Sequence, residues 1–154
     1  MLSRSSHYKA KIKDVGYTTF EGIVVFATIA VLTGAVAFIV LADKQIADTR
    51  NSQRASDVKV LIDATYQYAI DHKGELPVSI PLHAREICRG GGTDCTGLID
   101  LDVLVDENFL FKIPTDPTTA TFNGSGYHVV RSQGGRITIS APGTEWGKTI
   151  SESL

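Results

Sequence analysis

Charge and proline are both missing from long parts of this 154-residue sequence. No Asp, Glu, Lys or Arg occurs from Gly22 to Ala42, a run of 21 residues, and Asp43–Lys73 contains neither proline nor glycine. A helix of that charge-free length measures about 31 Å, at ~1.5 Å per residue, which is enough to cross the hydrocarbon core of a bilayer. The sequence therefore predicts a membrane-spanning helix that continues beyond the apolar run.

Cysteine is also scarce, with only Cys88 and Cys95 in the chain. Two thiols without further Cys or His at ligand spacing do not form a structural zinc site. The three glycines between them, Gly90–Gly92, make a loop flexible enough to bring the two side chains together. Both residues fall in the part expected outside the cytoplasm, where disulfides persist. We therefore predict a Cys88–Cys95 disulfide that closes a small loop.

Residues for catalysis or metal binding are scattered along the chain. The four histidines have no Cys or acid at a recognised triad or ligand spacing; they are His7, His72, His83 and His128. Four carboxylates share a segment predicted to be helical, where their spacing points several of them apart and favours a solvated face over a calcium site; they are Asp100, Asp102, Asp106 and Glu107. We therefore predict a protein that is not an enzyme and that holds no cofactor or metal ion.

The charge is distributed unevenly. Residues 1–16 carry +3, from four basic and one acidic side chain, whereas the remainder carries −5 and the whole chain −2. An acidic body argues against non-specific nucleic-acid binding, which needs clustered Lys and Arg. Basic residues beside an apolar segment keep that end cytoplasmic, so residues 43–154 are expected to lie outside the cytoplasm.

Apolar residues after the charge-free run recur at helical spacing, at Val58, Leu61, Ile62, Thr65 and Ala69. A Gly-then-Pro stop signal follows, with glycine at 74 and proline at 77. We predict one helix over about 17–73, hydrophobic all round in its first half (17–42) and amphipathic in its second (43–73).

The rest of the chain predicts a small antiparallel sheet that packs on the amphipathic half of the helix, giving an α+β fold with one head domain. Residues 74–125 are expected to form a loop region, with a helical turn around 84–87, a short helix within 98–111 and an optional strand around 120–122. Two β-branched runs joined by a Gly-Gly turn predict a hairpin over 126–142, and 143–154 form a tail. Asp116, between two prolines, is expected to cap a turn.

The stretch "VGYTTFEGIVVFATIAVL" resembles the N-terminal signature of type IV pilins and type II secretion pseudopilins. Gly16 matches the cleavage glycine, Tyr17 the new N-terminus and Glu21 the acid at the fifth mature position. The segment "IPTDP" at 113–117 is similar to a Pro-x-Asp-Pro element of small pseudopilins. The resemblance implies the pilin fold, with a long N-terminal helix packed against a small sheet.

The resemblance also implies a processing and assembly mechanism. A prepilin peptidase would remove leader 1–16 by cutting after Gly16, and the amine of Tyr17 would be methylated. In a filament, Glu21 would neutralise the N-terminal ammonium of a neighbouring subunit; two such charges ~4 Å apart attract by about 4 kcal/mol at an effective dielectric near 20. Ala30 and Gly34 form a small-xxx-small pair that permits close contact between helices.

The expected partners are identical or related pilins, the prepilin peptidase, and an inner-membrane assembly platform with its ATPase. The precursor would be a single-pass membrane protein, and the mature chain part of a cell-surface filament. Three alternatives stay open: a type II secretion pseudopilin, a monomeric signal-anchored binding domain outside the cytoplasm, and a secretory signal cut near Ala42. The last is disfavoured because the apolar run exceeds the usual 7 to 15 residues of a signal peptide. Adhesion, motility, DNA uptake and secretion are not distinguished by this subunit plan.

Overall fold

The computed structural model describes residues 16, 18–77 and 80–154. The expected leader, except for Gly16, and Tyr17 lie outside the described residues, so the cleavage junction is untested. The chain divides into two compact units, one reaching to Leu41 and the other formed by Ala42–Leu154. Each unit is described by itself below.

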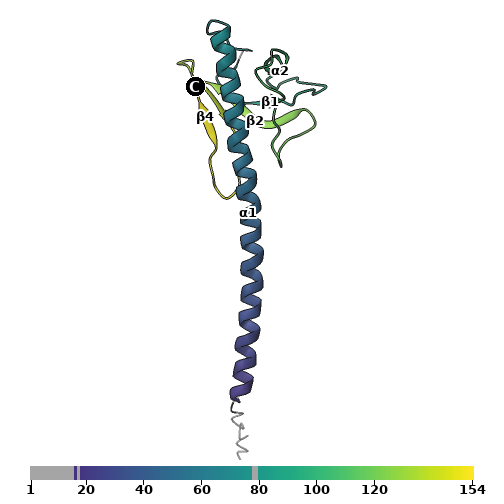
Figure 1. The fold of residues 1–154 in the computed structure, drawn as a ribbon, viewed down its shortest axis with the longest axis vertical. Coiled ribbons are helices and arrows are strands. Elements are labelled where there is room, and N and C mark those ends of the chain that lie inside the picture. Colours follow the sequence, from purple (N-terminus) through teal and green to yellow (C-terminus); the bar gives the residue numbers. More distant parts are fainter. Residues whose placement is uncertain (1–15, 17, 78–79) are drawn as a thin grey trace, which may run out of the picture. The chain divides into compact units, whose positions relative to one another are not determined.

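The main helix, α1 (Thr19–Asp71), has 53 residues (Figure 1). Thr18 caps its start, because the Thr18 Oγ1 accepts a hydrogen bond from the backbone N–H of Glu21 at 3.3 Å. At its end Gly74, at φ 92°, donates its N–H to the carbonyl of Ala69 at 2.7 Å, which satisfies a carbonyl of the last turn. The predicted helix is therefore confirmed to within two residues at each end.

Four strands form one antiparallel sheet in the order β1-β2-β3-β4. They are β1 (Arg85–Cys88), β2 (Gly124–Arg131), β3 (Ile137–Ser140) and β4 (Ser151–Ser153). A short helix, α2 (Val103–Asp106), lies between β1 and β2 in the chain. The hairpin predicted over 126–142 is present as β2 and β3, with His128 opposite Ser140 and Arg131 opposite Ile137.

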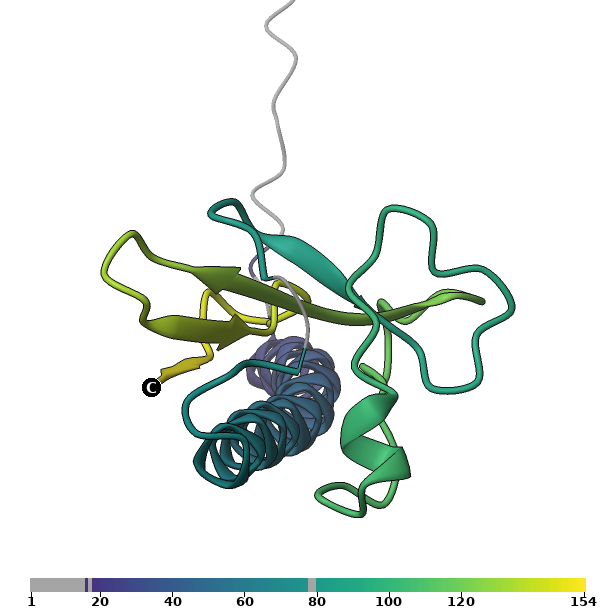
Figure 2. The same cartoon turned by 90° about the horizontal axis from the view of Figure 1, so that it is seen from above.

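The head core lies between the sheet and the second half of α1, with α2 beside the helix (Figure 2). The predicted apolar stripe of α1 is buried at Val58, Leu61, Ile62 and Thr65, whereas Ala69 is half-buried. The sheet contributes alternate residues of its two central strands, and the region around α2 adds two leucines. These are Tyr127, Val129, Ile137, Ile139, Leu101 and Leu104. A small antiparallel sheet packed on the amphipathic half of the helix is therefore confirmed.

Three local predictions in the loop and tail regions are wrong. Residues 84–87 do not form a helical turn, because Arg85–Cys88 is a strand paired with β2. Residues 120–122 are not a strand but part of a turn, in which Thr121 exchanges hydrogen bonds with Gly124. The tail at 143–154 includes β4, which pairs with β3. These pairings join segments far apart in sequence, so local patterns did not reveal them.

The predicted disulfide between Cys88 and Cys95 is confirmed, with the two Cα atoms 5.5 Å apart. Cys88 lies on β1 and is buried, whereas Cys95 is half-buried in the loop that follows. The bond therefore fastens the glycine loop to the edge of the sheet.

Candidate functional site

The side chain of Glu21 lies exposed in the first turn of α1. A carboxylate is favoured there by the partial positive charge at a helix N-terminus. Within the described residues, the Glu21 carboxylate makes no ion pair or side-chain hydrogen bond. A cation from outside the described residues could therefore pair with the Glu21 carboxylate.

The residues after Glu21 present an uncovered apolar surface. The most apolar 18-residue window of α1 has a mean hydropathy of 2.7 and none of it is buried, so α1 is long and apolar enough to cross a membrane. Phe20, Phe26 and Phe38 are each at least 75% exposed. Leaving apolar surface in contact with water costs roughly 25 cal/mol per Å², so contact with lipid or with another protein would stabilise this part of the helix.

An apolar groove runs along this part of α1 between two rows of side chains. One row is Ile23, Ala27 and Val31, and the other is Val24, Thr28 and Leu32. The residues of each row are four apart, so each row forms a ridge of the kind that packs between helices. The Thr28 hydroxyl donates to the carbonyl of Val25 at 2.8 Å, which satisfies its polar group within the helix. Sequence reasoning missed this groove, although the small residues Ala27 and Thr28 between larger apolar ones were its signal.

The predicted pair Ala30 and Gly34 borders the groove on the side of the Ile23–Ala27–Val31 row, and by helical geometry its centre is about a quarter of a turn from the midline of the groove. Both residues are exposed, and a Cβ added at Gly34 would meet nothing within 4 Å. The fold itself therefore does not require glycine at this position. The two faces together give the apolar half two neighbouring strips on which another helix can approach closely.

In the head, the most polar buried site centres on Arg54, whose side chain is fully buried. All five of its N–H groups are used, which is the full donor capacity of a guanidinium. Two go to Asp116, at 2.6 and 3.2 Å. The other three reach Asn51 Oδ1 at 2.9 Å, Glu145 Oε2 at 3.2 Å and Thr118 Oγ1 at 2.6 Å.

Asp116, the main partner of Arg54, also accepts hydrogen bonds from the backbone that follows it. Its Oδ1 also accepts the backbone N–H groups of Thr118 and Thr119, each at 2.8 Å, which is the turn-capping role predicted from the sequence. Burial by itself would raise the pKa of this carboxyl, but the Arg54 guanidinium and the two N–H groups outweigh burial and hold the pKa well below its ordinary value. Two glycines make room for it, since a Cβ at Gly126 would lie 2.6 Å from the Asp116 Cβ and one at Gly143 3.2 Å from its Oδ2.

Glu145 extends this cluster to the loop before β4. Its carboxylate accepts two hydrogen bonds from Arg50, at 2.8 and 2.6 Å, and the hydrogen bonds from Arg50 lower its pKa. Asn51 accepts the Glu145 N–H and donates to the Glu145 carbonyl, both at 3.1 Å. Because every charge of the cluster is paired, it offers no free acid or base, and its chemistry is that of a fastening between α1 and two loops.

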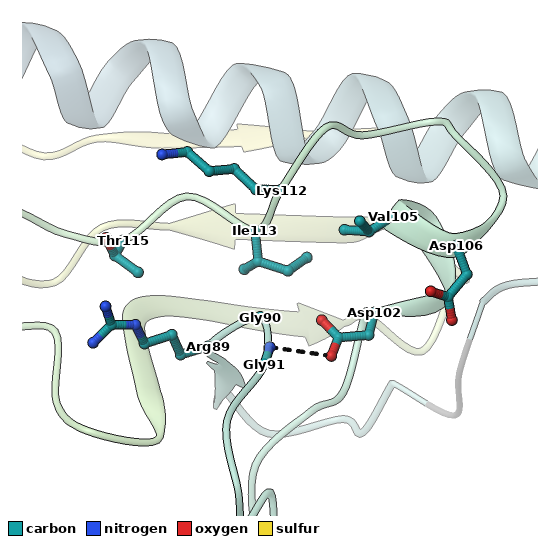
Figure 3. Close-up of a pocket in the computed structure, with 9 residues that line it drawn as sticks. All are labelled: Arg89, Gly90, Gly91, Asp102, Val105, Asp106, Lys112, Ile113 and Thr115. Atoms are coloured by element: carbon teal, nitrogen blue, oxygen red, sulfur yellow. Dashed lines mark hydrogen bonds between the residues drawn. The ribbon is translucent and has the colours of Figure 1, made fainter.

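A cavity of about 310 Å³ lies between the glycine loop and α2 (Figure 3). Arg89 and Lys112 lie on one side of the view, and Asp102 and Asp106 on the other. The Asp102 Oδ2 accepts the N–H of Gly91 at 3.4 Å. Two further carboxylates of this region have partners of their own, since Asp100 accepts the N–H of Asp102 and Glu107 lies 3.4 Å from His72. Among the described residues, no group of three or more His, Cys, Asp or Glu side chains is placed to hold a metal ion.

Comparisons of the chain with protein-family models, curated proteins and solved structures find no match. The functional argument therefore rests on the residues and geometry of this chain.

Proposed function

We propose that this chain is the precursor of a pilin or pseudopilin, a structural subunit that polymerises into a filament outside the cytoplasm. One observation carries the proposal. The second half of α1 completes the core of the head, whereas the most apolar part of the same helix has none of its residues buried. A helix with this division has an apolar half available first to a lipid bilayer and then to other copies of itself.

The groove and the small-residue pair explain how copies would pack. A ridge from one helix fits between the rows centred on Ala27 and Thr28 of the next. Ala30 and Gly34 let a further helix approach on the adjacent face. Each subunit thus carries two contact strips, which is what a helical bundle with several neighbours around each helix needs.

Glu21 gives this packing a fixed register. Apolar helices slide past one another at little cost, but a carboxylate in an apolar bundle is costly unless it meets a cation. Cleavage after Gly16 would supply that cation as the amine of Tyr17 on a neighbouring subunit. A subunit that is out of step would bury an unpaired acid, so the charge pair selects a single arrangement.

The mass of the protein isolated from its native membrane tests the proposal. We expect a chain that begins at Tyr17 with one added methyl group. Gly16→Ala should leave the leader attached, whereas the matched change Gly22→Ala, where an added Cβ meets nothing within 4 Å, should be processed normally. A native chain that retains Met1 would overturn the pilin proposal and leave a membrane-anchored head.

The type II secretion pseudopilin is the second candidate, favoured by a specific observation. The "IPTDP" segment, similar to an element of small pseudopilins, contains Asp116, which is buried under Arg54 and fastens that segment to α1. Both candidates share the partners expected from the sequence: other pilins, the prepilin peptidase, and an assembly platform with its ATPase. A monomeric anchored head would differ from both, because cross-linking in the membrane would yield no ladder of multimers.

A further inference from the structure

Trp146, the one tryptophan of the sequence, is 61% exposed on the loop before β4. Its backbone lies in the left-handed region at φ 57°, and Gly147 follows at φ 69°. A bulky residue with positive φ is uncommon and persists only where its surroundings fix it. The backbone conformation that presents this residue on the surface is therefore imposed by its neighbours.

The flanking residues supply that constraint. Glu145, on one side, is held by Arg50, Arg54 and Asn51. On the other side the Lys148 ammonium lies 2.7 Å from Asp48 Oδ1, and its carbonyl accepts the Thr144 hydroxyl at 2.5 Å. The indole is thus presented on a loop that is fastened to α1 at both ends.

The loop is fastened close to the point where the apolar run ends. Asp48 and Asn51 are six and nine residues beyond Ala42, which is about 9 to 14 Å along the helix at ~1.5 Å per residue. In Figure 1 the loop between β3 and β4 reaches along α1 toward its lower residue numbers, whereas α2 lies beside the C-terminal end of α1. Trp146 is therefore on the part of the head nearest the end of the apolar run.

The residues near Trp146 in the sequence and on α1 are of the types that proteins place at a membrane–water boundary. Ile46, one turn before Arg50 on α1, is 52% exposed. Lys148, two residues after Trp146, and Arg50, which is paired with the neighbouring Glu145, carry cationic groups on long apolar stems. Side chains of this kind suit the headgroup level, where the stem meets apolar surface and the charge meets water. Tryptophan itself concentrates at that level, where its ring meets apolar surface and its N–H meets polar groups.

We propose that Trp146 inserts into the lipid headgroup layer and seats the head on the membrane before assembly. The proposal rests on the membrane-spanning part of the proposed function, but not on filament formation. A lipid surface is favoured over a second copy because the loop that carries the indole is fastened to α1 within about 9 to 14 Å of the end of the apolar run.

Fluorescence of the full chain tests this directly, because Trp146 is its only tryptophan. The protein is reconstituted into phosphatidylcholine–phosphatidylglycerol vesicles that carry a nitroxide label either on the headgroup or deep in the acyl chain. Aqueous iodide is the third quencher, and flotation of the vesicles shows whether the chain is membrane-bound. We expect the headgroup label to quench several-fold more than the deep label, and iodide to quench several-fold less than in a free indole.

Moving the tryptophan gives the matched control. Phe111 is 93% exposed and lies two residues after Phe109, whose ring contacts Tyr68 near the C-terminal end of α1. The double variant Phe111→Trp, Trp146→Phe should therefore be quenched by iodide and hardly by the headgroup label.

Each other outcome overturns the proposal in a distinguishable way. A chain that floats with the vesicles while iodide quenches Trp146 freely removes the seating and leaves the proposed function intact. In another outcome, the indole is protected from iodide but is not quenched by the headgroup label. If that protection is lost when the protein is diluted into excess lipid, the indole contacts a second copy and not the headgroup layer. A chain that does not float with the vesicles removes both the seating and the membrane span.

Discussion

Arg54 donates two hydrogen bonds to Asp116, a residue 62 positions away in the sequence, and both side chains are fully buried. This pair joins the middle of α1 to the segment that precedes β2. Through Glu145 it also reaches the loop before β4, so one guanidinium links three parts of the head.

Asp116→Ala should destabilise the head strongly. The change leaves the Arg54 charge buried without its main partner, and breaking a buried ion pair in this way costs about 3–5 kcal/mol. Urea unfolding of the full chain in detergent, followed by Trp146 fluorescence, measures the loss in free energy of unfolding.

An exposed pair on the same helix provides the control. Lys59 and Asp63 lie 3.3 Å apart with side chains 68% and 55% exposed, so Lys59→Ala should cost no more than about 1 kcal/mol. If the two variants unfold at the same urea concentration, the buried cluster does not have the stabilising role assigned to it.

Acid should weaken the head because the pKa of Asp116 is lowered in the folded state. A carboxyl with a lowered pKa contributes stability that is complete well above its ordinary pKa of 3.8 and is lost as the pH falls below that value. The urea midpoint should therefore be lower at about pH 3 than at about pH 6. Asp116→Asn, which is less stable at both, should show a smaller difference between them; an equal difference would assign the acid sensitivity to other carboxyls.

Glu21→Ala should leave the chain in the membrane but reduce its incorporation into filaments at least about tenfold, because a loss of ~1.4 kcal/mol in subunit binding already has that effect. Filament yield is counted by electron microscopy, and membrane retention by fractionation. Asp43→Ala, which removes the acid at the other end of the apolar run, is the matched control and should assemble normally. Equal yields from the two variants would show that Glu21 does not set the register.

The two packing faces of α1 can be separated by adding bulk. Thr28→Leu fills the groove from the row farther from the small-residue pair, and Gly34→Leu blocks the pair itself, so each should reduce filament yield several-fold. Val36→Phe adds bulk on the side of the helix away from both faces and should have little effect. If only the Gly34 change impairs assembly, the groove is not a contact strip; if the Val36 change is equally harmful, packing is not restricted to these faces.

The sequence was sufficient for α1 because its signals are local. The apolar spacing from Val58 to Thr65 and the glycine and proline after the helix act within a few residues of one another. The β2–β3 hairpin and the Cys88–Cys95 disulfide were predictable for the same reason. Strands β1 and β4 were missed because each is defined by a partner that lies elsewhere in the chain.

The burial of the two polar side chains that α1 contributes to the cluster could have been predicted from their spacing along the helix. Asn51 and Arg54 fall on the same helical stripe as Val58 and Leu61, so their positions indicated burial although their side chains are polar. A buried guanidinium needs an acid, and Asp116 between two prolines was the acid held most rigidly by its own sequence. The identity of the pair still depended on the fold, because nothing local connects residues so far apart.

Strand β4 has a consequence for a protein that would be crowded among its own copies. It is three residues long, all of them exposed, and carries Glu152 at its centre. Long, flat, uncharged edge strands can pair with strands of neighbouring chains without limit, as in amyloid. An edge strand this short and negatively charged discourages such pairing. In the proposed filament, neighbouring heads would therefore stay separately folded, and the helices would set the geometry of the polymer.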